Sequence, residues 1–375
     1  MFNIIKKLFI ISLLICTNLF SSDFDERKSK GKIEYDNLDE ISGLVFGTSN
    51  PDIIWAVNDG RADEVYGMDR NGNSVTVLDF KKELLEQDTD IEDIATIRLN
   101  NLNYIVLADI GDNNENRETV NLYFVPELKF NGNPEMNVDE SLISKVQFKY
   151  EDGSRDAECM FIDPTTNNIY LVTKRETKAR MYELKSDLSF TKINTADFIL
   201  EFEFGNNVTE NSTGVTAGDI SKDGKHILIR DYTSVWYFSN DNNNLISNLQ
   251  NSGKKVESYT YSFNKEPQGE SIAWDSDNSG FYTASEEKSF ENFDSDLFYF
   301  KRIQTEIKKK NDLVYQNEIL NNRTNKTISY SLYNLLGQKV FHSQIRPKES
   351  IEFNTLEIKA RYLLYDNKFL IINSF

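Results

Sequence analysis

Short apolar runs separated by turn residues recur along most of the 375-residue chain. Five segments share one plan, in which a polar residue is followed by an apolar run, a turn and a second apolar run. In the third segment the two runs are Glu158–Ile162 and Ile169–Lys174, joined by the turn Asp163–Asn168. Apolar runs of this length, bounded by Gly, Pro, Asn and Asp, predict β-strands. The five segments begin at Ser42, Glu92, Glu158, Thr216 and Glu270.

Each segment continues into two further strands, the third rich in aromatic residues and the fourth alternating, as in Glu257–Phe263. The fifth segment has no fourth strand, and the unmatched N-terminal run Lys32–Tyr35 would supply it beside Leu297–Phe300. Such a displaced strand closes a ring of sheets. We therefore predict an all-β fold, a five-bladed β-propeller over residues 30–304. Alternation alone also fits a β-sandwich, but five repeats at intervals of 50 to 66 residues favour the ring.

The pattern changes after Arg302. The charged stretch at residues 305–312 is typical of a linker, and residues 313–375 alternate in a way that predicts a small β-sandwich of six or seven strands. One reading is an accessory immunoglobulin-like domain. The run Leu332–Val340, with a later Ile-Glu-Phe strand and an apolar C-terminal end, resembles the sorting domains of the type IX secretion system of Bacteroidota. That resemblance implies that the secretion machinery binds this domain and delivers the protein across the outer membrane.

The first 22 residues have the features of a signal peptide. Lys6 and Lys7 precede the apolar run Leu8–Ile15, and Ser21 and Ser22 lie near a plausible cleavage site. A lipoprotein signal ending at Cys16 is the alternative. We expect the mature protein to be secreted, either extracellular or held at the outer-membrane surface.

Composition narrows the function. The chain has 42 Lys plus Arg against 60 Asp plus Glu, a net charge of −18, which disfavours a nucleic-acid duplex as partner. With two Cys and two His, neither a disulfide framework nor chemistry that needs several imidazoles is expected. We expect a monomer.

The five leading residues would meet at one end of the propeller channel, because they begin the innermost strand of each blade. Three carboxylates this close repel one another and protonate unless a cation neutralises them, and hard oxygen ligands from carboxylates and hydroxyls suit Ca²⁺. The alternative is that the acids cap strand ends in solvent or pair with Lys174, Arg175 and Arg230. The predicted calcium ligands are Ser42, Glu92, Glu158, Thr216 and Glu270.

This set resembles the calcium-activated nucleotidases (apyrases), five-bladed propellers with a central Ca²⁺ bound by a Ser-Glu-Glu-Ser-Glu series. The resemblance implies the same ion here, with Thr216 in place of one Ser. It also implies hydrolysis of a phosphorylated substrate. Glu92 or Glu158 would then activate water while the ion holds the oxyanion.

A second group of polar residues follows an apolar run in the sequence Ala108–Arg117. Such a run can be an Asx-rich turn held by its own backbone hydrogen bonds, or it can contact an anionic substrate through its arginine. With the acid and basic residues of the neighbouring segments, it is similar to secreted phytase-like or esterase-like propeller proteins. The predicted substrate-binding residues are Asp59, Asp109, Asp112, Asn113, Arg117, Lys174, Arg175, Arg230 and Glu286.

Three functions stay open at this point. The first is a metal-dependent hydrolase of a small phosphorylated or otherwise anionic substrate. The second is a non-catalytic binding or scaffold propeller whose Ca²⁺ is structural. The third is a glycosidase, since a propeller funnel can present three carboxylates. No Gly-x-Ser-x-Gly motif is present, which disfavours serine-hydrolase chemistry.

Overall fold

The structure is a computed structural model that describes residues 23–60, 63–80, 85, 88–202, 214–241, 244–250, 253–287, 294–303, 313–316, 319–322, 325–333, 339–352, 362–365 and 368–371. The chain divides into two compact units, Met1–Ile303 and Gln304–Phe375. The predicted signal peptide and the linker at 305–312 lie outside the described residues. Among the described helices, none is long and apolar enough to cross a membrane.

The first unit is all-β, with four sheets. One has the order β2-β3-β4-β5-β9, with bounds Ile41–Phe46, Ile54–Asn58, Glu64–Met68, Ser74–Asp79 and Glu135–Asn137. Another, of four strands, has the order β15-β16-β17-β18, with bounds Val215–Ile220, His226–Asp231, Val235–Ser239 and Lys254–Lys255. A third has the order β1-β21-β20-β19, with bounds Lys28–Lys32, Asp296–Lys301, Gly280–Ala284 and Ser271–Trp274.

The largest sheet has eight strands in the order β11-β12-β13-β14-β10-β8-β7-β6. Their bounds are Ala157–Ile162, Ile169–Thr173, Ala179–Leu184, Asn194–Phe202, Ser144–Tyr150, Val120–Pro126, Leu102–Asp109 and Ile91–Leu99. Two antiparallel halves of four strands are joined by a short parallel pairing of Phe148–Tyr150 in β10 with Asn194–Ala196 in β14. Two short helical segments, η2 (Glu140–Leu142) and α2 (Leu245–Gln250), lie in the connections of this unit.

The innermost strands contact one another in a closed cycle, β2 to β6, β6 to β11, β11 to β15, β15 to β19, and β19 back to β2. These strands are buried almost throughout, and apolar side chains fill the space between neighbouring sheets. Buried on both faces, they read as continuous apolar runs in the sequence rather than as alternation. The arrangement is a β-propeller-like all-β fold.

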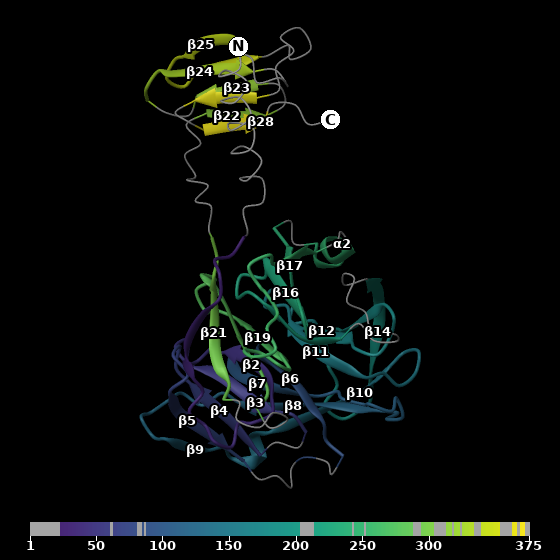
Figure 1. Cartoon of the computed structure of the whole chain (residues 1–375). Coiled ribbons are helices and arrows are strands. Elements are labelled where there is room, and N and C mark those ends of the chain that lie inside the picture. Colours follow the sequence, from purple (N-terminus) through teal and green to yellow (C-terminus); the bar gives the residue numbers. More distant parts are fainter. Residues whose placement is uncertain are drawn as a thin grey trace. The chain divides into compact units, whose positions relative to one another are not determined.

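The last sheet of the cycle is completed by the N-terminus. Strand β1, purple in Figure 1, runs antiparallel to β21, with Lys28 opposite Tyr299 and Lys32 opposite Asp296. The predicted position of this strand, Lys32–Tyr35, was wrong by about four residues. The paired segment Lys28–Lys32 is an exposed edge of polar residues and glycine, so it carries no apolar signal.

The predicted strand Glu257–Phe263 is also wrong. The fourth strand of its sheet is the short β18, which pairs Lys254 and Lys255 with β17, and residues 257–263 form turns and irregular chain. The buried Tyr259 hydroxyl accepts a hydrogen bond of 2.7 Å from Arg230, which draws this segment away from the sheet edge.

The second unit has two sheets among its described residues. One has the order β22-β23-β26, with bounds Leu313–Gln316, Ile319–Asn322 and Ser350–Glu352. The other has the order β25-β24-β27-β28, with bounds Lys339–Ile345, Ile328–Tyr333, Tyr362–Tyr365 and Lys368–Ile371. Part of the motif that resembles a sorting domain, residues 334–338, lies outside the described residues.

We expect Phe24→Ala to destabilise the first unit by about 3–5 kcal/mol, as for other fully buried Phe side chains. Phe24 is 1 % exposed and packs against Phe281 and Tyr237, with ring centroids 4.9 and 5.7 Å away. Urea unfolding of the variant and of the parent measures the difference. Phe263→Ala, at a side chain that is 57 % exposed, is the matched control and should change stability by less than about 1 kcal/mol. Equal effects of the two substitutions would show that the N-terminal segment does not hold the sheet together.

Candidate functional site

All five inner strands begin with the same backbone hydrogen bond. A residue just after the second strand of each pair donates its N–H to the carbonyl two residues before the leading residue of the first strand. The donor directly follows the second strand in four pairs and is one residue further on in the fifth. The pairs are Asp59 to Glu40, Ile110 to Asp90, Lys174 to Asp156, Tyr232 to Gly214 and Glu286 to Gln268, at 2.7 to 3.2 Å. The same contact therefore recurs at the start of all five inner strands, at one end of their cycle.

The leading residues lie just beyond this bond. The pairing of first and second strands shifts register around Ser42, Glu92, Glu158 and Thr216, so each is the extra residue of a β-bulge. Glu270 directly precedes β19. A bulge turns its extra side chain out of the normal alternation, which is why such features occur beside functional sites. These residues therefore occupy equivalent positions at one end of the channel.

Carboxylates gather at this end in two overlapping groups. Asp59, Asp90 and Glu92 bring one oxygen each within 4.8 Å of one another, and so do Glu92, Asp156 and Glu158. Either group could hold a metal ion. Glu270 belongs to neither group, although its charge contributes to the raised pKa of both Asp59 and Glu158.

Glu92 is common to both groups and is 7 % exposed. It forms no hydrogen bond or ion pair with any residue that the structure describes. Burial, followed by the charges of Glu158 and Asp59, raises the pKa of Glu92 well above its usual value. Gly111 lies directly against it, because a Cβ there would collide with carboxylate oxygens of Glu92 and Asp90.

The second group has basic partners. The Lys174 ammonium forms a buried ion pair with Glu158, and Arg175 forms one with Asp156. Burial still raises the pKa of Glu158 to about 8, against the opposing effect of Lys174. Arg175 is 37 % exposed and also donates to Asn113. It is thus a basic side chain at this end that solvent can reach.

Glu270 and Glu286 form a pair of buried carboxyl groups. Tyr232 donates to Glu270 at 2.9 Å, and Gln268 donates its side-chain amide to Glu286 at 2.9 Å. Burial and a hydrogen bond with Glu270 raise the pKa of Glu286 to about 9. Glu286 therefore holds its proton at neutral pH when no cation is bound.

The two predicted hydroxyl ligands face neighbouring strands. Ser42 Oγ donates to the carbonyl of Ile91 at 3.0 Å, and Thr216 Oγ1 donates to the carbonyl of Gly269 at 2.9 Å. Each hydroxyl thus bonds to the residue that precedes a leading carboxylate. Their protons point away from solvent, which leaves oxygen lone pairs as the groups that a cation would contact.

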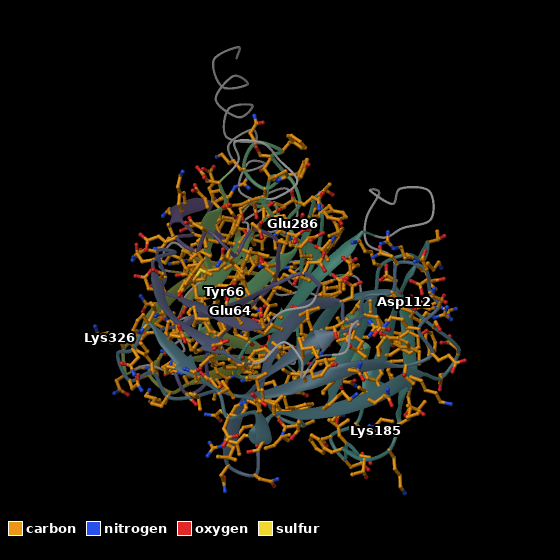
Figure 2. The ribbon with its side chains drawn as sticks, turned by 90° about the horizontal axis from the view of Figure 1, so that it is seen from below. Glu64, Tyr66, Asp112, Lys185, Glu286 and Lys326 are labelled. Atoms are coloured by element: carbon orange, nitrogen blue, oxygen red, sulfur yellow. The ribbon has the colours of Figure 1, made fainter. Side chains whose placement is uncertain are left out.

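In the loop after β7, the acids are hydrogen-bonded within the protein, as in the Asx-rich turn that the sequence left open. Asp109 is fully buried and accepts from Arg117, Asn121 and the backbone of Asp90. Asp112 accepts from the backbone N–H groups of Asn116 and Arg117, as in an Asx-rich turn. The Arg117 guanidinium donates to Asp109 and to the carbonyl of Gly111. Asn113 is exposed. In Figure 2 Asp112 also lies well apart from Glu286.

Arg230, a predicted substrate-binding residue, is fully buried in the structure. Its side chain has no exposed surface and bonds to Glu266, the Tyr259 hydroxyl and the carbonyl of Ser271. A Cβ at Gly269 would overlap its guanidinium. Arg230 therefore supports the segment that leads into Glu270 from inside the protein.

Sequence reasoning missed Asp90, Asp156 and Tyr232. A signal for the two acids was present, since each lies two residues before a leading carboxylate in an Asp-x-Glu sequence. Both acids of each motif flank the first residue of the same inner strand, Ile91 of β6 or Ala157 of β11, so they lie at the same end of that strand. No pattern distinguishes Tyr232.

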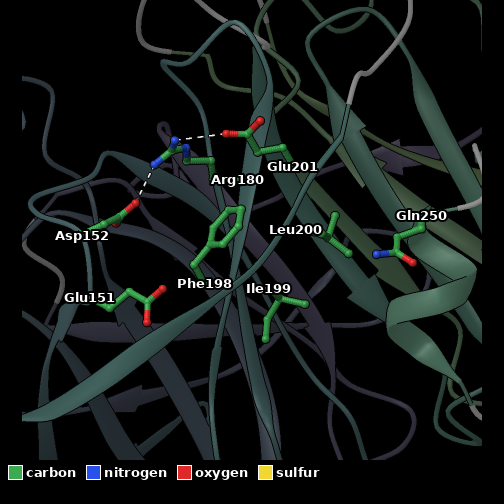
Figure 3. Close-up of a pocket in the computed structure, with 8 residues that line it drawn as sticks. All are labelled: Glu151, Asp152, Arg180, Phe198, Ile199, Leu200, Glu201 and Gln250. Atoms are coloured by element: carbon green, nitrogen blue, oxygen red, sulfur yellow. Dashed lines mark hydrogen bonds and ion pairs between the residues drawn. The ribbon is translucent and has the colours of Figure 1, made fainter.

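Figure 3 shows a depression lined by residues of β14, where Leu200 lies toward Gln250 of α2 and Phe198 lies below Arg180. Arg180 crosses it and bonds to Asp152 at 2.6 Å and to Glu201 at 3.1 Å. The charge of Arg180 is therefore already paired, and none of the predicted site residues lines the depression.

Comparison with protein families and with curated proteins gives no match. Among solved structures, the chain is similar to a luciferin-regenerating enzyme at 9 % identity and a TM-score of 0.41, covering 73 % of this chain and 95 % of that chain. It is also similar to a chain of a nidogen/laminin complex at 11 % identity and a TM-score of 0.38, covering 68 % and 74 %.

We expect the metal-free protein to lose stability as the pH rises from about 5 to 9. Burial raises the pKa of Asp59 to about 7, and Glu158 and Glu286 titrate at about 8 and 9. The folded state then holds protons that the unfolded chain releases above about pH 4, so unfolding releases protons. Each retained proton is worth about 1.4 kcal/mol per pH unit. Urea unfolding in a chelator at several pH values measures the slope.

Glu286→Gln should reduce that slope, because it removes one of the titrating groups. Asp187→Asn, at an exposed carboxylate after β13, is the control and should leave it unchanged. Stability that rises between pH 6 and 9 would contradict the raised pKa values.

Proposed function

We propose that residues 30–304 form a five-bladed β-propeller whose acidic end binds a divalent cation, and that this cation is Ca²⁺. Five inner strands in a closed cycle, each begun by the same backbone hydrogen bond, support the blade count. The donors at the acidic end are carboxylate and hydroxyl oxygens, without His or Cys, and such donors suit Ca²⁺ better than Zn²⁺.

The proposed cation site rests on a single observation. The Glu92 carboxylate is buried at the junction of two carboxylate groups and has no hydrogen-bond partner among the described residues. A buried carboxylate without a partner is costly, and it either stays protonated or binds a cation. The five acids Asp59, Asp90, Glu92, Asp156 and Glu158 outnumber the two basic side chains that pair with them, Lys174 and Arg175.

The proposed activity is metal-dependent hydrolysis of a small phosphorylated or otherwise anionic substrate. The cation would bind a substrate oxyanion and lower the pKa of bound water. Among the residues at this end, Glu158 has a pKa of about 8 in the metal-free protein, close to the range that a general base needs. Arg175 is exposed enough to contact an anion beside it.

The second candidate is a binding or scaffold propeller with a structural ion. It is favoured by the depth of the carboxylates, since Glu92, Glu158 and Glu270 are each less than 10 % exposed. An ion enclosed in this way would keep no ligand position for a substrate.

The proposal includes export through the type IX secretion system and delivery to the cell surface or medium. Its support is the Leu332–Val340 motif and the division of the chain into two compact units, the second a separate β unit.

We expect Ca²⁺ to stabilise the parent protein and to stabilise Glu92→Gln much less. A ligand that binds only the folded state adds about 2.7 kcal/mol at a hundredfold excess over its dissociation constant. Thermal melting in a chelator and with added CaCl₂ measures both shifts. Glu135→Gln, at an exposed position of β9, is the control and should respond to Ca²⁺ as the parent does. If Ca²⁺ leaves the parent melting curve unchanged, the proposed function is wrong.

The same preparations separate enzyme from scaffold. Hydrolysis of nucleoside triphosphates and p-nitrophenyl phosphate should require Ca²⁺ and should fall at least a hundredfold in Glu158→Gln if Glu158 is the base. Calcium binding with no hydrolysis of any phosphate ester would favour the scaffold.

Removal of residues 313–375 should leave the first unit folded and retained in the periplasm, because the sorting signal would be lost. Cell fractionation and immunoblotting of the truncated and full chains measure this. Normal surface delivery of the truncated chain would contradict the secretion proposal.

A further inference from the structure

The acidic end of the channel is divided into two halves by its own basic residue. On one side the Lys174 ammonium forms an ion pair with Glu158 and lies 5.0 Å from the centre of the Tyr232 ring. Tyr232 in turn donates to Glu270. The charges of Glu158 and Glu270 both raise the pKa of Lys174, so its ammonium serves both carboxylates. This half already contains a cation supplied by the chain.

The other half contains Asp59, Asp90 and Glu92 and has no such residue. These three carboxylates form no ion pair with any described residue, although their oxygens lie within 4.8 Å of one another. After burial, the charge of Arg117 has the largest effect on the pKa of Asp90, which it lowers. The Arg117 guanidinium itself donates to Asp109 and to the carbonyl of Gly111. Asp59 and Asp90 share a side-chain hydrogen bond with each other, and no described residue gives Glu92 such a partner. Carboxylates this close are unfavourable when all of them are charged.

Two further observations point to a ligand in this half. Glu92 is only 7 % exposed, and it has no hydrogen-bond partner in the described part of the chain. Oδ1 of Asp59 is also a buried oxygen atom without a partner. The Glu92 and Asp90 carboxylates both lie against Gly111, where even a Cβ would collide with them, so they converge on one point.

We propose that a divalent cation binds between Asp59, Asp90 and Glu92, and that the Lys174 ammonium is the permanent cation of the Glu158–Glu270 half. The inference rests on the proposed cation binding and gives that cation a position. It replaces a site shared by all five leading residues with one built from a single leading residue and two acids from adjoining segments.

Electrostatics explains why the two halves differ. A divalent ion placed against Glu158 would lie beside the Lys174 ammonium, which repels it. At Asp59, Asp90 and Glu92 the same ion meets three negative charges, and no basic side chain forms an ion pair with these acids among the described residues. Three carboxylates, some of them bidentate, with water completing the shell, are an ordinary ligand set for Ca²⁺.

Titration calorimetry of CaCl₂ into the chelator-treated full chain tests this position. The parent should bind one ion. Asp59→Asn and Asp90→Asn should each raise the dissociation constant at least tenfold, because each removes a ligand. Glu158→Gln should raise it less than threefold, because Glu158 is not a ligand. Asp187→Asn, at an exposed carboxylate after β13, is the matched control and should bind as the parent does.

Lys174→Gln gives the sharpest test. Without the ammonium, Glu158 and Glu270 lose their cation, and a second Ca²⁺ should bind, changing the stoichiometry from one to two. Unfolding midpoints in chelator show whether each variant is folded. If Asp90→Asn does not fold, Asp59→Asn, at a half-buried residue just after β3, provides the ligand test.

Different failures have different meanings. If Glu158→Gln abolishes binding while Asp59→Asn does not, the ion lies in the other half, and this inference is wrong while the proposed function stands. If Lys174→Gln binds one ion or none, the role given to Lys174 is wrong. If the parent binds no Ca²⁺, the proposed function and this inference fail together.

Discussion

The backbone hydrogen bond that starts each inner strand is the constraint on which the acidic end depends. It fixes the carbonyl two residues before the leading residue to the N–H that follows the second strand. In four of the five pairs of first and second strands, the chain between this bond and the regular ladder has one extra residue, and that residue bulges. The backbone thus creates equivalent positions, and the side chains placed there decide the chemistry.

Burying charged side chains at these positions costs free energy. Carboxylates removed from water need a proton, a hydrogen-bond donor or a cation, and the protein uses all three. Glu270 and Glu286 are joined by a hydrogen bond, Asp156 receives a backbone N–H and Arg175, and Glu158 receives Lys174. Beneath them the buried Arg230–Glu266 pair holds the segment before Glu270. Glu92 is the carboxylate for which the described residues supply none of these.

The sequence was informative where a repeat could be compared with itself. The continuous apolar runs and the five polar residues before them located the inner strands and the bulged positions without reference to distant contacts. Prediction failed where one side chain overrode the pattern, as when Tyr259 turned inward to Arg230 and ended a strand. The sequence also did not show that Asp109 and Arg230 are buried, because a charged residue that is bonded within the protein looks the same in sequence as one that faces solvent. Pairing of the leading acids with Lys174 was an alternative that the sequence left open, and the fold shows that its partner is Glu158.

The pairing of β1 with β21 has a consequence for how the chain acquires its structure. The last sheet needs residues from both ends of the first unit, so its contacts have very large sequence separation, and folds rich in such contacts form slowly. A ribosome releases the N-terminal residues long before β21 exists. Until the ring closes, β21 and its neighbours present an open sheet edge that can pair with other chains. A protein built in this way benefits from a chaperone that keeps the whole unit unfolded until its final strand is available.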